Sequence, residues 1–127
     1  MQNVLDFYAV LFGITPVQAA DQLLRPQLLG SALSRPRNYA EYQNADLALQ
    51  AAVLAHGIAE GQVFIDGNKR TALIAMTTFL GRNGQRITAP VEEVADWILA
   101  LSAGSTAEEL AEHIRTALVP FRPDGDP

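Results

Sequence analysis

Residues 61–82, GQVFIDGNKRTALIAMTTFLGR, join a short loop to an apolar helix and decide the fold that we expect for this chain. The apolar positions of the helix recur at helical spacing and cover a broad face: Leu73, Ile74, Met76, Phe79 and Leu80. An apolar face this wide is typical of a helix that its neighbours cover on most sides. We therefore expect a central helix from about Asn68 to Arg82, which Asn83-Gly84 ends in the left-handed conformation.

Helical periodicity also dominates the rest of the chain, and no segment shows the alternation of a strand. Asn44 is the expected N-cap of a helix that runs to about residue 60, and Thr106 and Glu109 have the spacing of a capping box. Proline at position 36 predicts an irregular segment over residues 35–37. Besides the central helix, helices are expected over residues 3–12, 17–24, 27–33, 45–60, 90–103 and 107–118.

These elements predict an all-α bundle of about six helices around the central one. The length of 127 residues fits one domain, which we place at residues 1–119, and residues 120–127 are expected to form a flexible tail. The N-terminus lacks both the basic region of a signal peptide and an apolar stretch long enough to span a membrane. Together with the absence of cysteine, this predicts a cytoplasmic protein that does not associate with membranes.

The charge is acidic overall but unevenly distributed along the chain. Nine basic residues stand against 14 acidic ones, and the net charge of −5 argues against direct nucleic-acid binding. Residues 25–86 nevertheless contain seven basic and four acidic residues, whereas residues 87–127 contain two basic and eight acidic ones. A positive middle in an acidic protein favours a localised anion site.

Residues 62–70, QVFIDGNKR, carry the parts of such a site, and we name them the motif segment. The N–H groups and the dipole of a helix N-terminus favour a phosphate, and Gly67 allows the backbone to approach a ligand closely. Lys69 and Arg70 place two cations where the helix dipole disfavours them, which indicates an anionic partner. Asn68 could bind a phosphate or ribose oxygen or cap the helix, and Asp66 could hold Mg²⁺ beside phosphates or act as a cap.

The stretch FIDGNKRTA (64–72) resembles the signature of the Fic/Doc (Fido) family, specifically of its death-on-curing (Doc-type) toxins. Their pattern is His-x-Phe-x-Asp-(Gly/Ala)-Asn-Lys-Arg. The resemblance extends over LLRPQLLGSALSRPR (23–37) and FLGRNGQRI (79–87), so it spans most of residues 20–120. It implies the Fido-type all-α bundle, with the motif loop at the N-terminus of the central helix.

The resemblance implies transfer of a nucleotide-derived group to a protein hydroxyl. Doc-type members are kinases that phosphorylate translation elongation factor Tu, whereas classical Fic members transfer AMP. This chain has Lys69 where AMP-transferring relatives have a second glycine, and Leu73 where they have a further phosphate-binding arginine. Both residues resemble the Doc branch, and the resemblance therefore implies a kinase toxin that uses ATP and Mg²⁺.

The resemblance also implies roles for the motif residues. Asp66 would bind the metal or assist the attacking hydroxyl, and Lys69 and Arg70 would act in catalysis by neutralising phosphate charge. The implied nucleotide-binding positions are Phe64, Gly67, Asn68, Lys69 and Arg70. Gln62 stands where the family has its catalytic histidine, and a glutamine amide cannot accept a proton at neutral pH.

Loss of the general base typically costs about 10²–10⁴ in rate, although phosphoryl transfer depends heavily on positioning and charge. Gln62 is either a natural feature of a silent or repurposed protein or a change introduced to permit production of a toxin. His56 lies inside an expected helix and His113 lies among charged neighbours, so neither is expected to replace the base. The alternatives to an impaired kinase are an AMP transferase and a non-catalytic nucleotide- or partner-binding module.

Some Fic relatives carry an inhibitory Ser/Thr-x-x-x-Glu-Gly element in the same chain. Glu60-Gly61 matches its end, but His56 stands where serine or threonine is required. The resemblance therefore implies inhibition in trans, by a Phd-like antitoxin segment that covers the cleft. Arg35 and Arg37 lie in the matched upstream segment and either reach the nucleotide or target or are simply exposed.

Overall fold

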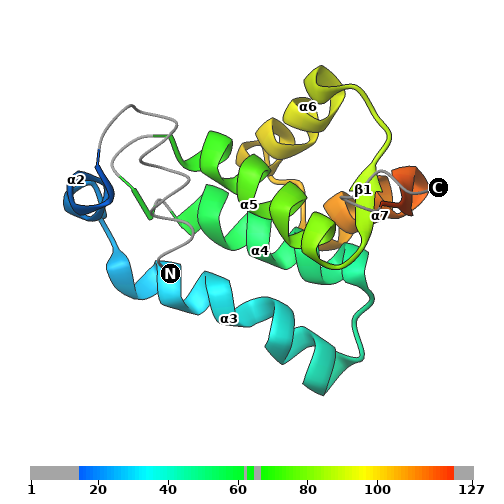
Figure 1. Ribbon diagram of the computed structural model, residues 1–127, viewed down its shortest axis with the longest axis horizontal. Helices are drawn as coiled ribbons and strands as arrows, with labels where there is room; N and C mark the ends of the chain where they lie inside the picture. The colour runs from blue at the N-terminus through cyan, green and yellow to red at the C-terminus, as the bar shows by residue number, and fades with distance from the viewer. Residues whose placement is uncertain (1–14, 62, 65–66, 122–127) are drawn as a thin grey trace.

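The structure is a computed structural model that describes residues 15–61, 63–64 and 67–121. It confirms the expected all-α class (Figure 1). The described helices are α2 (Pro16–Asp21), α3 (Pro26–Gln43), α4 (Leu47–Gly61), α5 (Asn68–Arg82), α6 (Val91–Ser102) and α7 (Ala107–Ala117). Two short strands, β1 (Gln85–Ile87) and β2 (Leu118–Pro120), complete the described part. The helix expected over residues 3–12 lies outside it.

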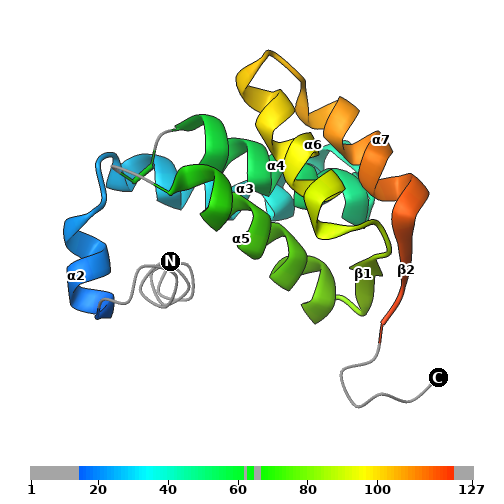
Figure 2. The ribbon, with the colours of Figure 1, turned by 90° about the horizontal axis from the view of Figure 1, so that it is seen from above.

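Helix α4 lies at the centre of the bundle. It runs between α3 and α5, and the α6–α7 hairpin packs against the α4–α5 pair (Figures 1 and 2). Nine of its 15 residues are buried, against five of 15 in α5. The expectation that the helix after the motif segment is the central one is therefore not confirmed. Alanine-rich α4 takes that place because small side chains allow neighbouring helices to approach on several sides.

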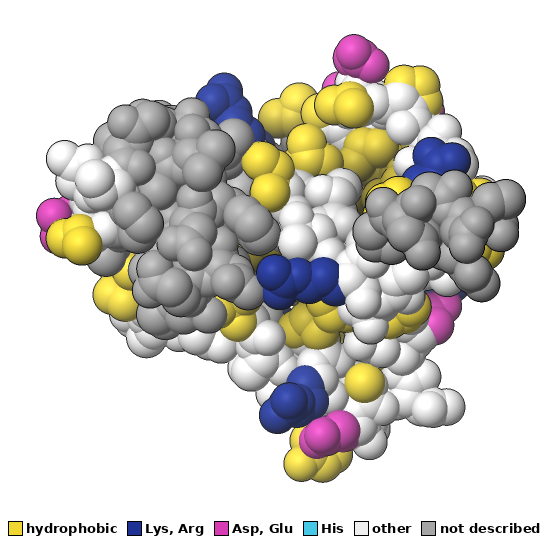
Figure 3. All heavy atoms as spheres, viewed as in Figure 1, with side chains coloured by type: hydrophobic (Ala, Val, Ile, Leu, Met, Phe, Trp, Pro, Cys, Tyr) yellow, Lys and Arg dark blue, Asp and Glu magenta, His cyan; other side chains and the backbone are white. Residues whose placement is uncertain are grey.

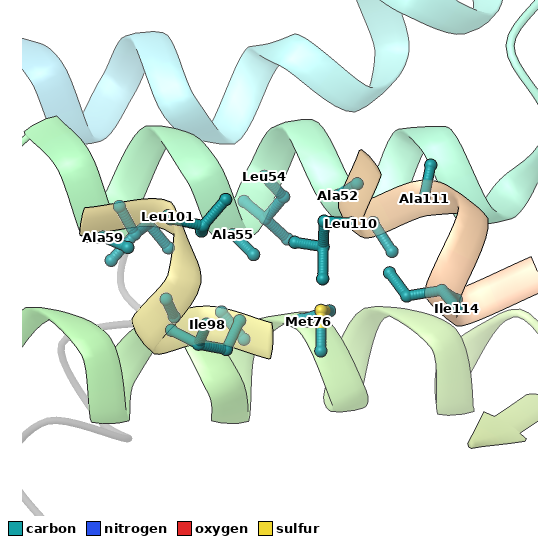
Figure 4. Close-up of a cluster of buried hydrophobic side chains, with 14 of the residues drawn as sticks. Ala52, Leu54, Ala55, Ala59, Met76, Ile98, Leu101, Leu110, Ala111 and Ile114 are labelled. Atoms are coloured by element: carbon teal, nitrogen blue, oxygen red, sulfur yellow. The ribbon is translucent and has the colours of Figure 1, made fainter. Parts of the chain in front are cut away.

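The core forms where side chains from four helices meet. Figure 4 shows residues of α4, α5, α6 and α7 pointing toward one another, with Met76 of α5 near the middle. Helical spacing predicts a buried stripe of Leu47, Ala51, Leu54 and Ile58 on α4. The last three are buried and Leu47 is partly buried. Burial of apolar surface of this kind contributes about 25 cal/mol per Å² and holds the helices together. Within the described ranges, no helix is both long and apolar enough to cross a membrane.

Two expectations around α3 and α4 are wrong. Helix α3 continues through Pro36, which is buried within it, so residues 35–37 are helical and not irregular. Proline removes one hydrogen bond of the helix, but burial on the α4 side offsets this loss. Asn44 does not begin α4; it ends α3 in the left-handed conformation, with φ 53°. The N-cap role belongs to Asp46, whose Oδ1 accepts a hydrogen bond from the Leu49 N–H at 3.0 Å.

The expectation of a chain without strands is also wrong in one place. Strands β1 and β2 pair antiparallel, with Arg86 opposite Val119. Pro120 belongs to β2, and the Phe121 N–H donates to the Gly84 carbonyl at 2.8 Å, so the expected tail does not begin at residue 120. Residues 122–127 lie outside the described part of the chain. Strands of three residues are too short to show alternation, and only the fold brings them together.

An ion pair fastens the start of α4 to α7. Arg115 Nε lies 2.7 Å from Asp46 Oδ2, and its Nη2 lies 3.1 Å from Oδ1. The hydrogen bond from Arg115 lowers the pKa of Asp46. A carboxylate with a lowered pKa stabilises the fold at neutral pH, and this contribution is lost as acid protonates it. Both side chains are partly exposed, so solvent screening keeps the contribution small.

Gly57 permits the close contact between α3 and α4. A Cβ at this position would lie 2.8 Å from Ala32 Cβ and 3.2 Å from Arg35 Nη1. We expect Gly57→Ala to lower the free energy of unfolding by about 1–3 kcal/mol, because the two helices must move apart. The matched control is Gly30→Ala in α3, where no atom lies within 4 Å of the added Cβ and the variant should gain up to about 1 kcal/mol. Urea unfolding measures both, and equal losses would contradict the close contact.

Candidate functional site

The motif segment is tied to the chain that precedes α3. The Leu24 and Arg25 N–H groups both donate to the Val63 carbonyl, at 2.8 and 3.0 Å, and Leu23 forms an antiparallel bridge with Phe64. Val63 and Phe64 are completely buried. The helix expected over residues 17–24 therefore ends at Asp21, because the following backbone bonds to the motif segment. This contact joins residues about forty positions apart, and sequence reasoning missed it.

The Asn68 side chain closes a ring with the backbone of Phe64. The Phe64 N–H donates to Asn68 Oδ1 at 2.8 Å, and Asn68 Nδ2 donates to the Phe64 carbonyl at 2.9 Å. Asparagine can make both bonds because its amide presents an acceptor and a donor side by side. The ring fixes the path of the backbone immediately before α5. Asn68 therefore shapes the motif segment through its side chain, a role that the sequence did not reveal.

Helix α5 begins with its two cations facing solvent. Gly67 has φ 78° and precedes the helix, and its carbonyl accepts the first hydrogen bond of the helix, from the Thr71 N–H at 3.0 Å. No side chain caps this end in the described structure. Lys69 and Arg70 are exposed in the first turn, and no described carboxylate lies within 4 Å of the Lys69 ammonium. The arrangement presents positive charge and the positive end of the helix dipole on one side.

A buried hydroxyl lies behind this turn. Thr71 is completely buried, and its Oγ1 has no hydrogen-bond partner among the described residues. A buried polar atom without a partner costs free energy, and most buried polar atoms in proteins have one. Nothing in the sequence marks this residue, because a threonine in an apolar helix is ordinary.

The structure describes only some of the predicted site residues. Phe64, Gly67, Asn68, Lys69 and Arg70 lie together at the start of α5. Gln62 and Asp66, the expected base position and metal ligand, lie outside the described residues. No group of three or more potential metal ligands occurs among the residues that the structure describes. Magnesium needs few protein ligands when it binds with a nucleotide, because phosphates and water supply the rest.

The other candidate residues lie on α3, α4 and α7. Arg35 is half-buried and Arg37 is exposed, both within α3 and not in a loop. His56 is half-buried and lines a hollow with Arg35 and Glu60. His113 is exposed, and its ring stacks on Trp97 with centroids 5.2 Å apart.

Removal of the Asn68 amide should loosen the motif segment. Asn68→Ala removes both hydrogen bonds between this side chain and the Phe64 backbone, and we expect a loss of about 1–3 kcal/mol in the free energy of unfolding. The matched control is Asn83→Ala at the other end of α5, where the amide makes a single exposed bond to the Phe79 carbonyl and the loss should stay below about 1 kcal/mol. Hydrogen exchange of the Phe64 amide tests the mechanism directly, and unchanged protection in Asn68→Ala would contradict it.

The sequence of the chain matches a known protein family. No curated protein matches the chain. The model of the Fic/DOC family matches residues 2–80, well over half of the chain, and the match includes the whole motif segment and most of α5. The chain therefore belongs to the Fic/DOC family.

Proposed function

We propose that this protein is a Doc-like toxin that transfers the γ-phosphoryl group of ATP to a hydroxyl of a target protein. The observation that carries the proposal is the start of α5, where the Asn68–Phe64 ring and Gly67 shape the backbone and Lys69 and Arg70 are exposed. Family membership supports nucleotide-dependent transfer in general. Lys69 and Leu73, in place of the glycine and arginine of AMP-transferring relatives, favour phosphoryl transfer. Elongation factor Tu is the proposed target, and the cytoplasm is the proposed location.

Each residue of the motif segment has a different role in the proposed reaction. The helix N-terminus binds phosphate oxygens, and Gly67 lets the backbone approach them. Lys69 and Arg70 offset the charge of the phosphates, which is the main requirement of phosphoryl transfer. Asp66 would hold Mg²⁺, which supplies further charge neutralisation when bound with ATP. Gln62 can hydrogen-bond the target hydroxyl but cannot remove its proton, so we propose that the activity is impaired.

Two other functions are compatible with the same site. An AMP transferase would use the same phosphate-binding turn but break a different bond of ATP. A non-catalytic module would bind a nucleotide or partner without turnover, and Gln62 is the observation that favours it. Calorimetry with Mg·ATP tests the part that the kinase and the AMP transferase share. Absence of binding would exclude both as functions of this chain.

We also propose that an antitoxin segment inhibits the protein in trans. An apolar groove of about 280 Å³ lies between α5 and α6, and its lining includes Leu73, Ile74 and Arg86. Hydrophobic side chains gather over these helices on the face shown in Figure 3. Lys69 lies one helical turn before the groove, and Arg86 lies in its lining, so the groove has a basic residue near each end. An amphipathic helix with acidic residues would match both its apolar lining and these basic residues.

Addition of a Phd-like antitoxin segment should protect the start of α5 and this groove from hydrogen exchange. Backbone amides of α5 from Lys69 to Thr77 should exchange more slowly, because a docked helix excludes water from this side. Helix α7 serves as the internal control, since it lies away from the groove. Protection confined to acidic α7 would contradict this mode of inhibition.

A further inference from the structure

A second hollow is lined by described residues outside the motif segment, and we name it the polar cleft. It has a volume of about 610 Å³ and opens between α3, α4 and the turn that joins α6 to α7. Its walls carry Arg35 and Tyr39 from α3, His56 and Glu60 from α4, and Glu108 from α7. None of its described lining residues belongs to residues 62–70. Its size is typical of pockets that bind small molecules.

The basic side of the polar cleft has no partner within the described protein. Arg35 is half-buried, yet its guanidinium forms no ion pair and no hydrogen bond with a described residue. The Tyr39 hydroxyl and the His56 ring likewise make no hydrogen bond there. Partial burial of a charge without a partner is costly. The planar guanidinium presents donors that match a carboxylate.

Neighbouring residues fix the position of this guanidinium. Arg35 Nη1 lies 3.2 Å from the place where a side chain at Gly57 would begin, so the glycine leaves room for it. Arg35 also lines the smaller hollow of about 170 Å³ that continues toward Gly61. The arginine is therefore held against α4 and does not extend freely into solvent.

Two carboxylates also line the polar cleft, those of Glu60 and Glu108. Glu60 has one described partner, the Ser102 hydroxyl at 3.5 Å, and Glu108 forms no ion pair with a described residue. Although both carboxylates line the same cleft as Arg35, neither comes within 4 Å of it. Val53 and Leu101 supply a buried apolar floor between the charges. A ligand that bridges these groups needs a negative end, a positive end and an apolar part.

We propose that the polar cleft binds a small zwitterion of amino-acid or dipeptide size. Its carboxylate pairs with Arg35 and accepts hydrogen bonds from Tyr39 or His56, its ammonium lies near Glu60 and Glu108, and its apolar side chain covers Val53 and Leu101. This arrangement gives the Arg35 guanidinium a partner. Because a zwitterion has no net charge, the cleft has the same net charge with and without the ligand. The site is separate from the nucleotide site and does not depend on the proposed kinase activity.

Calorimetric titration of the full chain with the dipeptide glycyl-leucine tests the proposal. We expect saturable binding below about 10 mM, the range of a weak ligand of this size. Two blocked peptides test the contribution of each charge. N-acetyl-glycyl-leucine lacks the ammonium group, and glycyl-leucinamide lacks the carboxylate group. Each should bind at least about tenfold more weakly, since each loses a charge-assisted contact. Absence of saturable binding of glycyl-leucine to the folded chain overturns the proposal.

Variants of the lining residues test whether the dipeptide binds in the polar cleft. Arg35→Gln and Glu108→Gln should each weaken glycyl-leucine about tenfold or more. Arg37→Gln and Glu92→Gln are the matched controls, because both residues are exposed and neither lines the cleft. Circular dichroism confirms that each variant is folded. Equal affinity in Arg35→Gln and Arg37→Gln overturns the proposal, as does displacement of the dipeptide by Mg·ATP, which places it in the nucleotide site.

Discussion

Gln62→His is expected to raise phosphoryl transfer to elongation factor Tu by about 10²–10⁴, with little change in the affinity for ATP. Imidazole titrates near neutral pH and can accept the proton of the target hydroxyl, whereas the amide of Gln62 cannot. The proposed phosphate-binding turn with Lys69 and Arg70 is the same in both chains, so only the proton-transfer step should change. Transfer from γ-labelled and α-labelled ATP measures the rate and identifies the group that moves.

Gln62→Ala is the control for this experiment, because alanine also lacks a base and should remain as slow as glutamine. Transfer of the γ-label by the histidine variant alone supports an impaired Doc-type kinase. Transfer of the α-label would instead identify an AMP transferase. If neither label moves to elongation factor Tu or to other bacterial proteins while ATP still binds, the chain is a non-catalytic module.

Removal of both cations at the start of α5 is expected to lower the affinity for ATP. Simultaneous Lys69→Ala and Arg70→Ala should weaken Mg·ATP about a hundredfold or more, because each charge-assisted phosphate contact contributes about 1.5–3 kcal/mol. Lys69→Ala alone should not lower the stability of α5, since a cation in the first turn of a helix opposes its dipole. Calorimetry gives the affinity, and thermal unfolding shows that the fold is intact.

Arg82→Ala provides a matched control for this measurement. Arg82 is exposed in the last turn of the same helix, so its removal changes the net charge of the protein without touching the proposed site. ATP affinity should stay within about twofold of the unmodified chain, because at physiological salt a charge one helix length away is largely screened. A similar loss of affinity in both variants would show that overall charge, and not the start of α5, governs nucleotide binding.

Local chemistry accounts for the features that the sequence predicted correctly. The capping box of Thr106 and Glu109 forms because its bonds join residues three positions apart. Gly84 follows α5 with φ 78°, as expected for the glycine after a helix. The buried stripe of α4 follows from helical periodicity, which depends on the sequence within the helix alone. The motif segment was found in the same way, because its residues are consecutive.

The errors arose where distant segments meet. Pro36 looked like an interruption, but the packing of α3 against α4 offsets the bond that the proline removes. Asparagine is favoured both at the start and at the end of a helix, so residue type alone does not say which role Asn44 has. In the structure Asn44 ends α3, and Asp46 caps the start of α4. The pairing of β1 with β2 joins segments about thirty residues apart, and nothing in either segment alone indicates the other.

The sequence by itself determined the helical class, the bounds of α5, α6 and α7 to within a residue, and the position of the motif segment at the start of α5, because these depend on neighbouring residues. Only the tertiary structure decided that α4 is the central helix, that residues 23–25 bond to the motif segment, and that Arg35 and Glu108 line one cleft. These arrangements require helices to pack in one particular way. Their energies come from burial and hydrogen bonds between segments far apart in the chain, and a pattern within one segment cannot encode them.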